Sequence, residues 1–410
     1  MIVEAAEWMV DVLEEHLEEL ESLWTRRLAH LLSDDVIVAG LARIDRRIAA
    51  HTDGLVLAGD HALPILAEAL ESGERALTLA AAFAMASSCR TEMVRPVLEA
   101  LPAAADEARE GLRLALTLGP MEATKDALLE LAGAGPSPVA AVALSALAFH
   151  GQPLPPQRLA ELARSPDPNS RRLLCRAVSY AGVDNRSEWL LDQLVADEDA
   201  TVRREALSAA AWTKRPWLLD HCRTLAKQPT VESWEALELL AVLGEPKDAA
   251  LILAAASTEA LGRRRITLLG SFGHPLVVDM LIDTMRCGAV GTAAEAGRAF
   301  LKITGVDVST DRSMPAVETK SAQLSEEEID FIETVKLPDA DRADNYWKEH
   351  QGELASATRL LHGREAAAVS VSLGDLTVVL RTRWEMTLRA RYRGQARGTP
   401  QDLERLPQGA

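Results

Sequence analysis

The sequence is poor in aromatic residues, which make up 4% of its 410 residues. The apolar fraction is nevertheless 48%, because alanine and leucine supply most of it. Both are strong helix formers, whereas strands favour β-branched and aromatic side chains. Small alanine side chains also let helix axes approach closely. The composition therefore predicts an all-α fold of stacked helices.

Long uncharged apolar runs are also missing. No stretch approaches the roughly 20 apolar residues of a membrane-spanning helix. From Met1 to Leu20 the sequence holds no Lys or Arg, so the basic start of a signal peptide is absent. The cysteines form no CxxC pair, which favours reduced core residues over disulfides. We expect a cytoplasmic protein without membrane association. The cysteines are Cys89, Cys175, Cys222 and Cys287.

Net positive charge is lacking as well. The formal net charge is −17, and phosphate binding needs a basic face. We therefore expect no nucleic-acid partner for this chain.

Motifs that carry chemistry are absent. The sequence contains no GxxxxGK[ST], GxGxxG or HExxH pattern. His221 and Cys222 are adjacent, which on a helix directs them about 100° apart and suits one metal ion poorly. We read them as one exposed histidine and one buried cysteine. We predict no catalytic residue, no metal ligand and no cofactor.

What the sequence does contain is an internal repeat. Successive helix-ending positions recur at intervals of roughly 30 residues, a regularity typical of helix–turn–helix repeats. Each position follows an apolar stripe with helical spacing. Several are followed by a proline that can open the next helix, as in Gly119–Pro120. The positions are Gly119, Gly151, Gly182, Lys214, Gly244, Gly273 and Gly305.

Two stretches resemble the HEAT-repeat signature, DEDATVRREALSAAA at 197–211 and PDPNSRRLLCRAVSYAG at 166–182. The resemblance implies that Val202 and Ala206 are core residues and that Asp199 and Arg203 belong to a ladder between repeats. In the second stretch it implies that Asp167 corresponds to Asp199, and that Arg171 or Arg172 corresponds to Arg203.

Four regions are predicted. Residues 1–60 form an N-terminal helical cap, with an apolar stripe from Met9 to Leu28. Residues 61–308 form an α-solenoid of HEAT-like helix pairs. Residues 309–323 are polar and read as a linker. Residues 324–410 form a small helical C-terminal module: a capping box of Ser325 and Glu328 opens a helix through Val335, and further helices are expected near 345–361 and 374–392.

A second resemblance covers nearly the whole chain. HLEELESLWTRR (16–27), RIAAHTDGLVLAG (47–59), YWKEHQGELASATRLLHG (346–363) and the helix around Trp384 are similar to an uncharacterised bacterial family of HEAT-like proteins. Members tend to be encoded beside type VI secretion components. The resemblance implies an accessory or effector-binding role in secretion, and it brings no active-site residues.

The function these features favour is a non-catalytic protein-binding scaffold or adaptor. Arginine and aromatic anchors commonly dominate such interfaces, although core packing is the alternative for each tryptophan. Rival functions are a chaperone that releases its cargo and a DNA glycosylase of HEAT-like type, which needs a basic concave face. The partner and the oligomeric state stay open. The candidate protein-binding residues are Arg172, Arg204, Trp212, Trp217 and Trp234.

Overall fold

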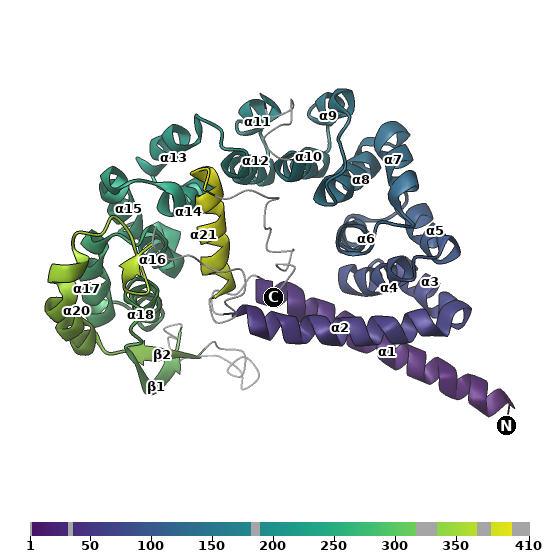
Figure 1. Cartoon of the computed structure of the whole chain (residues 1–410), viewed down its shortest axis with the longest axis horizontal. Coiled ribbons are helices and arrows are strands. Elements are labelled where there is room, and N and C mark those ends of the chain that lie inside the picture. The colour runs from purple at the N-terminus through teal and green to yellow at the C-terminus, as the bar shows by residue number, and fades with distance from the viewer. Residues whose placement is uncertain (1, 32–35, 182–188, 317–333, 367–378, 396–410) are drawn as a thin grey trace, which may run out of the picture. The chain divides into compact units, whose positions relative to one another are not determined.

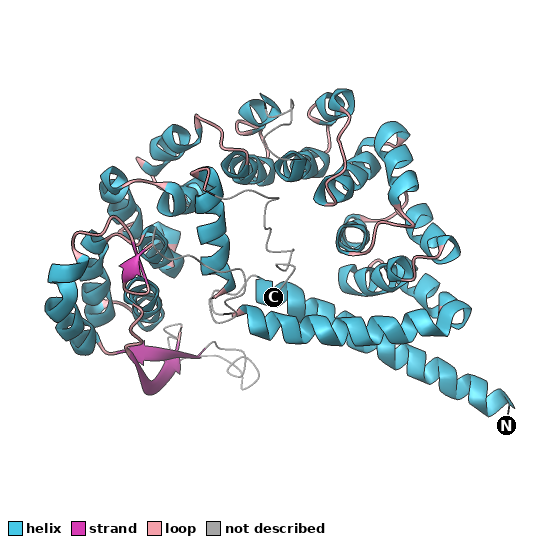
Figure 2. Ribbon diagram, in the orientation of Figure 1, coloured by secondary structure: helices cyan, strands magenta, loops and turns pink. Residues whose placement is uncertain are grey.

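The computed structural model describes residues 2–31, 36–181, 189–316, 334–366 and 379–395, and helices predominate in it (Figures 1 and 2). The chain divides into two compact units. Unit 1 runs to Lys214 and takes in the last described helix, and unit 2 begins at Arg215. The boundary falls inside the region 61–308. None of the described helices is long and apolar enough to cross a membrane.

Unit 1 opens with a helical hairpin of α1 (Ile2–Leu31) and α2 (Val38–Ala58). The predicted apolar stripe is confirmed, because Leu13, Leu20 and Trp24 are all under 5% exposed. Both helices pack on α4. Trp24 meets Phe83 of α4 edge to face, with 5.0 Å between ring centroids. The hairpin thus covers the first helix of the row described next.

Five helices of unit 1 form an inner row in which each packs on the next (Figure 1). They are α4 (Arg75–Ser87), α6 (Asp106–Leu118), α8 (Ser137–Phe149), α10 (Pro168–Ala181) and α12 (Ala200–Trp212). Shorter helices lie outside them: α3 (Leu63–Glu71, after the 3₁₀ turn η1, Gly59–His61), α5 (Thr91–Ala100), α7 (Lys125–Ala134), α9 (Pro156–Leu162) and α11 (Trp189–Leu194).

The helix ends follow the predicted period with one addition. Lys214 has a φ of 57°, which confirms that it fills a glycine position in the left-handed region. Cys89 also has a left-handed φ of 55° at the end of α4. It stands one repeat period before Gly119, so it opens the series. Gly119 itself has a φ of −76°, and a Cβ there would lie 2.8 Å from the carbonyl oxygen of Ala115. Gly182 lies outside the described residues.

The last described helix, α21 (Leu380–Tyr392), packs on α12. Its first residue, Leu380, joins an apolar cluster with Leu31, Val38 and Leu41 of the N-terminal hairpin. Its Arg391 donates from Nε to the carbonyl oxygen of Trp212 at 3.0 Å. The helix α21 therefore connects the N-terminal hairpin to α12, the last helix of the inner row.

Unit 2 also contains a row of helices that pack on one another. A second row, α14, α16 and α18, packs in chain order. The helices are α13 (Leu218–Ala226), α14 (Trp234–Leu243), α15 (Ala249–Ala256), α16 (Thr267–Phe272), α17 (Val278–Cys287) and α18 (Val290–Thr304). Short 3₁₀ turns lie between α13 and α17: η2 (Val231–Ser233), η3 (Pro246–Asp248), η4 (Glu259–Leu261), η5 (Arg263–Ile266) and η6 (Pro275–Val277).

The predicted linker is in part a strand. β1 (Ser309–Pro315) pairs antiparallel with β2 (Thr334–Pro338), so Val335 lies in a strand rather than at the end of a helix (Figure 2). Ser325 and Glu328 lie outside the described residues. The ribbon is mostly exposed and packs on α18 through Ala316 and Val335. Backbone pairing therefore holds it, and its sequence carries no apolar period to reveal it.

The C-terminal module is helical only in part. α20 (Ala340–Leu354) begins earlier than expected because Asp339 accepts a hydrogen bond from the Arg342 N–H and caps it. The prediction of helix up to Leu361 is wrong at its end, because Leu360–Leu361 forms strand β3, which pairs with β4 (Arg364–Glu365) in a small hairpin. His362 and Gly363 turn it with φ of 48° and 74°. Positive φ at both central residues is the tight turn that suits strand twist.

This hairpin closes the carboxyl ends of the row in unit 2. The N–H of Leu360 donates to the Gly273 carbonyl, that of His362 to Lys302 and that of Gly363 to Ile303. The last carbonyls of a helix have no partner within it. The hairpin supplies those partners at the ends of α16 and α18.

Gly111 marks the closest approach between α4 and α6. A Cβ there would lie 2.6 Å from the carbonyl oxygen of Arg75, which is backbone and cannot move aside. Gly111→Ala is therefore expected to destabilise the protein by about 1–3 kcal/mol. Gly133→Ala in α7, where no atom lies within 4 Å, is the control and is expected to stabilise by about 0.5–1 kcal/mol. Urea unfolding of both variants measures this, and equal effects would contradict it.

Two histidines join α1 to α2. The Nδ1 atoms of His16 and His51 lie 3.0 Å apart, so one ring donates to the other. Burial lowers the pKa of His51, and the charges of His16 and Arg47 lower it further. Glu19 and Glu15 raise it, but the net shift is downward. The unfolded chain then binds the proton more readily. The stabilisation is complete above about pH 6.5 and is lost as the pH falls below it. Melting temperatures from pH 8 to 5 test this; His51→Gln should flatten the dependence.

Candidate functional site

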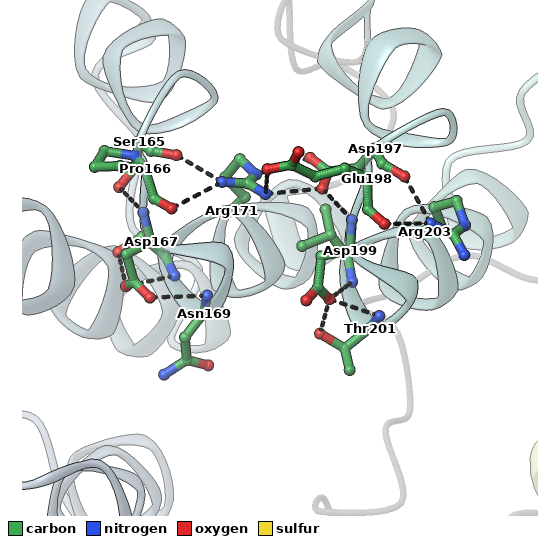
Figure 3. A network of polar contacts seen from close by, with 12 residues as sticks. Ser165, Pro166, Asp167, Asn169, Arg171, Asp197, Glu198, Asp199, Thr201 and Arg203 are labelled. Carbon is green, nitrogen blue, oxygen red and sulfur yellow. Dashed lines mark hydrogen bonds and ion pairs between the residues drawn. The ribbon is translucent and has the colours of Figure 1, made fainter.

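A ladder of polar contacts joins the amino ends of α10 and α12 (Figure 3). Asp167 accepts from the N–H groups of Asn169 and Ser170, and Asp199 accepts from those of Thr201 and Val202. An aspartate at this place satisfies N–H groups that have no partner within the helix. Both aspartates therefore act as caps of their own helices.

The contact between the two repeats is made by Arg171 and Asp197. Nε and Nη2 of Arg171 donate to the two oxygens of Asp197 at 2.7 and 2.8 Å (Figure 3). Both side chains are 8% exposed. Burial alone would raise the pKa of Asp197, but the hydrogen bonds from Arg171 and from the Asp199 N–H hold it below its usual value. The pair is thus a buried, two-pronged link between α10 and the turn before α12.

Arg203 occupies the same place one repeat later. Its Nη1 donates to the carbonyls of Asp197 and Glu198, as Nη1 of Arg171 does to those of Ser165 and Pro166. These two bonds of Arg203 lie within its own repeat, so its expected part in a ladder between repeats stays a prediction. Between Arg171 and Arg172 the structure selects Arg171. Asp197, rather than Asp199, makes the ion pair between the repeats, since the oxygens of Asp199 are committed to its cap.

A second group of charges lies on the inner row itself; we call it the arginine–glutamate cluster. At its centre, Glu110 accepts hydrogen bonds from Nε and Nη2 of the fully buried Arg113 at 2.8 Å each. Arg75 of α4 and Arg172 of α10 approach the same carboxylate to 3.9 and 3.6 Å. The cluster comprises Arg75, Glu110, Arg113, Arg172, Arg176 and Glu205.

The cluster spans helices that are not adjacent. Glu110 belongs to α6 and Arg172 to α10, and both helices pack on α8 between them. From Val139 to Phe149, α8 is buried and consists of small or apolar residues, so no long polar side chain of α8 intervenes. On the far side, Nε and Nη2 of Arg176 reach the oxygens of Glu205 on α12 at 3.2 and 3.3 Å. Charges from four inner helices therefore meet in one band.

Arg172 differs from the other arginines of the cluster. Nε and Nη2 of its guanidinium donate to the neutral amide oxygen of Asn169 at 3.1 and 2.8 Å. Burial lowers the pKa of Arg172 and Arg176 lowers it further, while Glu110 and Glu205 oppose the shift. The side chain keeps 22% of its surface exposed. Its cation is thus half-buried, near carboxylates that it does not hydrogen-bond.

The other predicted binding residues lie in different surroundings. Trp212 is 4% exposed and belongs to the core, so the core alternative is the correct one for it. Trp217 is half-buried and meets His221 edge to face. Trp234 is half-buried beneath the Arg264 guanidinium, 4.2 Å from the ring centroid. Arg204 is exposed on α12.

Five members of the cluster were not singled out from the sequence. A signal existed, because the polar positions Asn169, Arg172 and Arg176 are spaced by three and four residues and share one face of α10. Glu110 and Arg113 have the same spacing of three. What the sequence could not supply is the pairing between helices that lie far apart along the chain.

The expectation that the cysteines are core residues is correct for Cys175 and Cys222 and wrong for Cys89 and Cys287, which are exposed. Cys222 is buried, and burial raises the pKa of its thiol to about 12. Burial likewise raises the thiol pKa of Cys175 well above its usual value. A nucleophilic cysteine needs the opposite shift. Within the described ranges, no group of three or more His, Cys, Asp or Glu side chains could hold a metal ion.

Comparison with known proteins identifies no family. No family model matches the chain. No curated protein matches it either. Among solved structures, an engineered protein is 17% identical over 69% of this chain and 88% of that chain, with a TM-score of 0.33. A likeness at that score carries no argument about function.

Proposed function

We propose that this protein is a non-catalytic scaffold that binds another protein through an α-solenoid of HEAT-like repeats. In a solenoid each repeat contacts its neighbours, and the stacked helices build an extended surface. A partner is then held by many modest contacts and a few anchors.

The observation that carries the proposal is the ordered packing of the inner row in unit 1. The helices α4, α6, α8, α10 and α12 each pack on the next, and the helix ends recur at a nearly constant interval. Arg171 and Arg203 each donate from Nη1 to the carbonyls of the residues five and six positions before them. Tandem repeats produce regularity of this kind.

The role that follows from the resemblance to HEAT-like proteins near secretion genes is an accessory or adaptor of a type VI secretion apparatus, acting in the cytoplasm. The partner is then a secretion component or an effector. Holding an effector before export differs from static scaffolding only in the release of the cargo.

Affinity capture from the native host, followed by mass spectrometry, tests the proposal. The tagged full chain should enrich one protein or a small set of proteins over a tag-only control. Recovery of nucleic acid alone, together with gel-shift binding that weakens steeply with salt, would replace the scaffold by a nucleic-acid enzyme. Release of a captured effector when the apparatus is present distinguishes a chaperone from a scaffold.

A further inference from the structure

Arg172 lies among carboxylates but donates its guanidinium hydrogen bonds to a neutral group. Arg113 donates two hydrogen bonds to Glu110, and Arg176 donates two hydrogen bonds to Glu205. Arg172 instead donates twice to Asn169, while the nearest oxygen of Glu110 stays 3.6 Å from Nη2. A carboxylate is a stronger acceptor than an amide for a guanidinium fork. An incoming carboxylate can therefore take these donors from Asn169.

The cluster holds four arginines and two glutamates, so its net charge favours an anion at this place. Burial penalises the cation of Arg172 and Arg176 acts on it as a like charge, while Glu110 and Glu205 act the other way. The half-buried position weakens screening by water, so an added negative charge is worth more here than on an open surface. Glu110 and Glu205 lie beside the arginines, and their charges repel a continuous polyanion.

We propose that Arg172, with the arginine–glutamate cluster around it, recognises an acidic peptide segment of a protein partner. The proposal rests on the scaffold function above and names the chemistry of its ligand. A short segment with one or two Asp or Glu side chains fits, because each carboxylate matches one guanidinium fork. A nucleic acid would need a basic track along its backbone, and this chain carries a net charge of −17.

The test is fluorescence anisotropy with the full chain and a fluorescein-labelled, glutamate-rich peptide at low salt. A glutamine-rich peptide of equal length is the control probe. We expect Arg172→Gln to weaken glutamate-peptide binding about tenfold or more. Arg172→Lys keeps the charge but loses the planar guanidinium. Its affinity for the glutamate-rich peptide should lie between those of the unaltered chain and of Arg172→Gln. Arg95→Gln removes the same charge from an exposed position on α5 and should leave binding unchanged.

Equal binding by the Arg172→Gln variant and the unaltered chain would overturn the proposal, as would equal binding of the two peptides. An oligonucleotide that displaces the peptide and depends on Arg172 would overturn the peptide class. Circular dichroism melts confirm that each variant is folded. In affinity capture, loss of the partner with Arg172→Gln supports the site. If the variant still captures the partner, the scaffold function stands but the binding site at Arg172 is wrong. If neither chain captures a partner, the scaffold function itself is wrong.

Discussion

Replacing Arg171 by alanine is expected to lower the free energy of unfolding by about 3–5 kcal/mol, because it leaves a buried carboxylate without its partner. Arg171 and Asp197 are both 8% exposed and join two repeats through two hydrogen bonds. The variant also loses the bonds from Nη1 to the carbonyls of Ser165 and Pro166. Denaturant unfolding followed by circular dichroism measures the loss.

An exposed ion pair supplies the matched control. Arg47 and Glu19 lie at a similar distance of 2.8 Å, but their side chains are 48% and 44% exposed. Arg47→Ala is expected to cost less than about 1 kcal/mol. If the two alanine variants lose similar stability, burial is not what makes the ladder strong.

The contribution of Asp197 to stability depends on pH. Because the pKa of Asp197 is lowered on folding, its contribution is present above about pH 4 and is lost as the pH falls further.

Replacing Arg359 by methionine is expected to destabilise unit 2 by about 3 kcal/mol or more, because several helix-end carbonyls lose their donor in a buried place. Arg359 is 6% exposed. Its Nη1 donates to the carbonyls of Ala241 and Ser271 at 2.9 and 2.6 Å, and its Nη2 to that of Gly244 at 3.1 Å. The guanidinium also lies over the ring of Phe272, 5.4 Å from its centroid.

The position explains the size of the effect. A cation is favoured at the carboxyl end of a helix, where unpaired carbonyls carry partial negative charge. Arg359 serves the ends of α14 and α16 at once and anchors the hairpin that closes α16 and α18. Its loss should therefore also expose the amides of Leu360, His362 and Gly363 to hydrogen exchange.

Arg364 in the same hairpin is the control, since it is exposed on β4. Arg364→Met should change stability by no more than about 0.5 kcal/mol. Hydrogen exchange measured by mass spectrometry separates the two variants locally, and denaturant unfolding separates them globally. Unchanged amide protection in Arg359→Met would show that the backbone bonds of the hairpin hold it without the guanidinium.

Local signals in the sequence were sufficient for most helices. The period of helix ends predicted that Lys214 stands in a glycine place, and its φ of 57° agrees. The stripe of Leu13, Leu20 and Trp24 predicted the buried face of α1. The apolar spacing that reveals a helix is a property of neighbouring residues, so it can be read without knowledge of the fold.

The two ribbons escaped prediction for a physical reason. β1 and β2 bury little, and the β3–β4 hairpin has two residues in each strand. Backbone hydrogen bonds to each other and to helix ends contribute to their stability, and such bonds leave no pattern of side chains in the sequence. Asp339, which starts α20 early, is by contrast a capping residue of a kind that a sequence does reveal.

What the sequence alone determined is the helical character and the repeat period, because both follow from the spacing of residues along the chain. Tertiary structure alone decided that Arg171 makes the link while Arg172 keeps a neutral partner, that Trp212 is buried, and that Glu110 gathers arginines from three helices. Adjacent residues on a helix point about 100° apart. Which of the two meets the neighbouring repeat therefore depends on how the helices pack, and composition and spacing do not encode it.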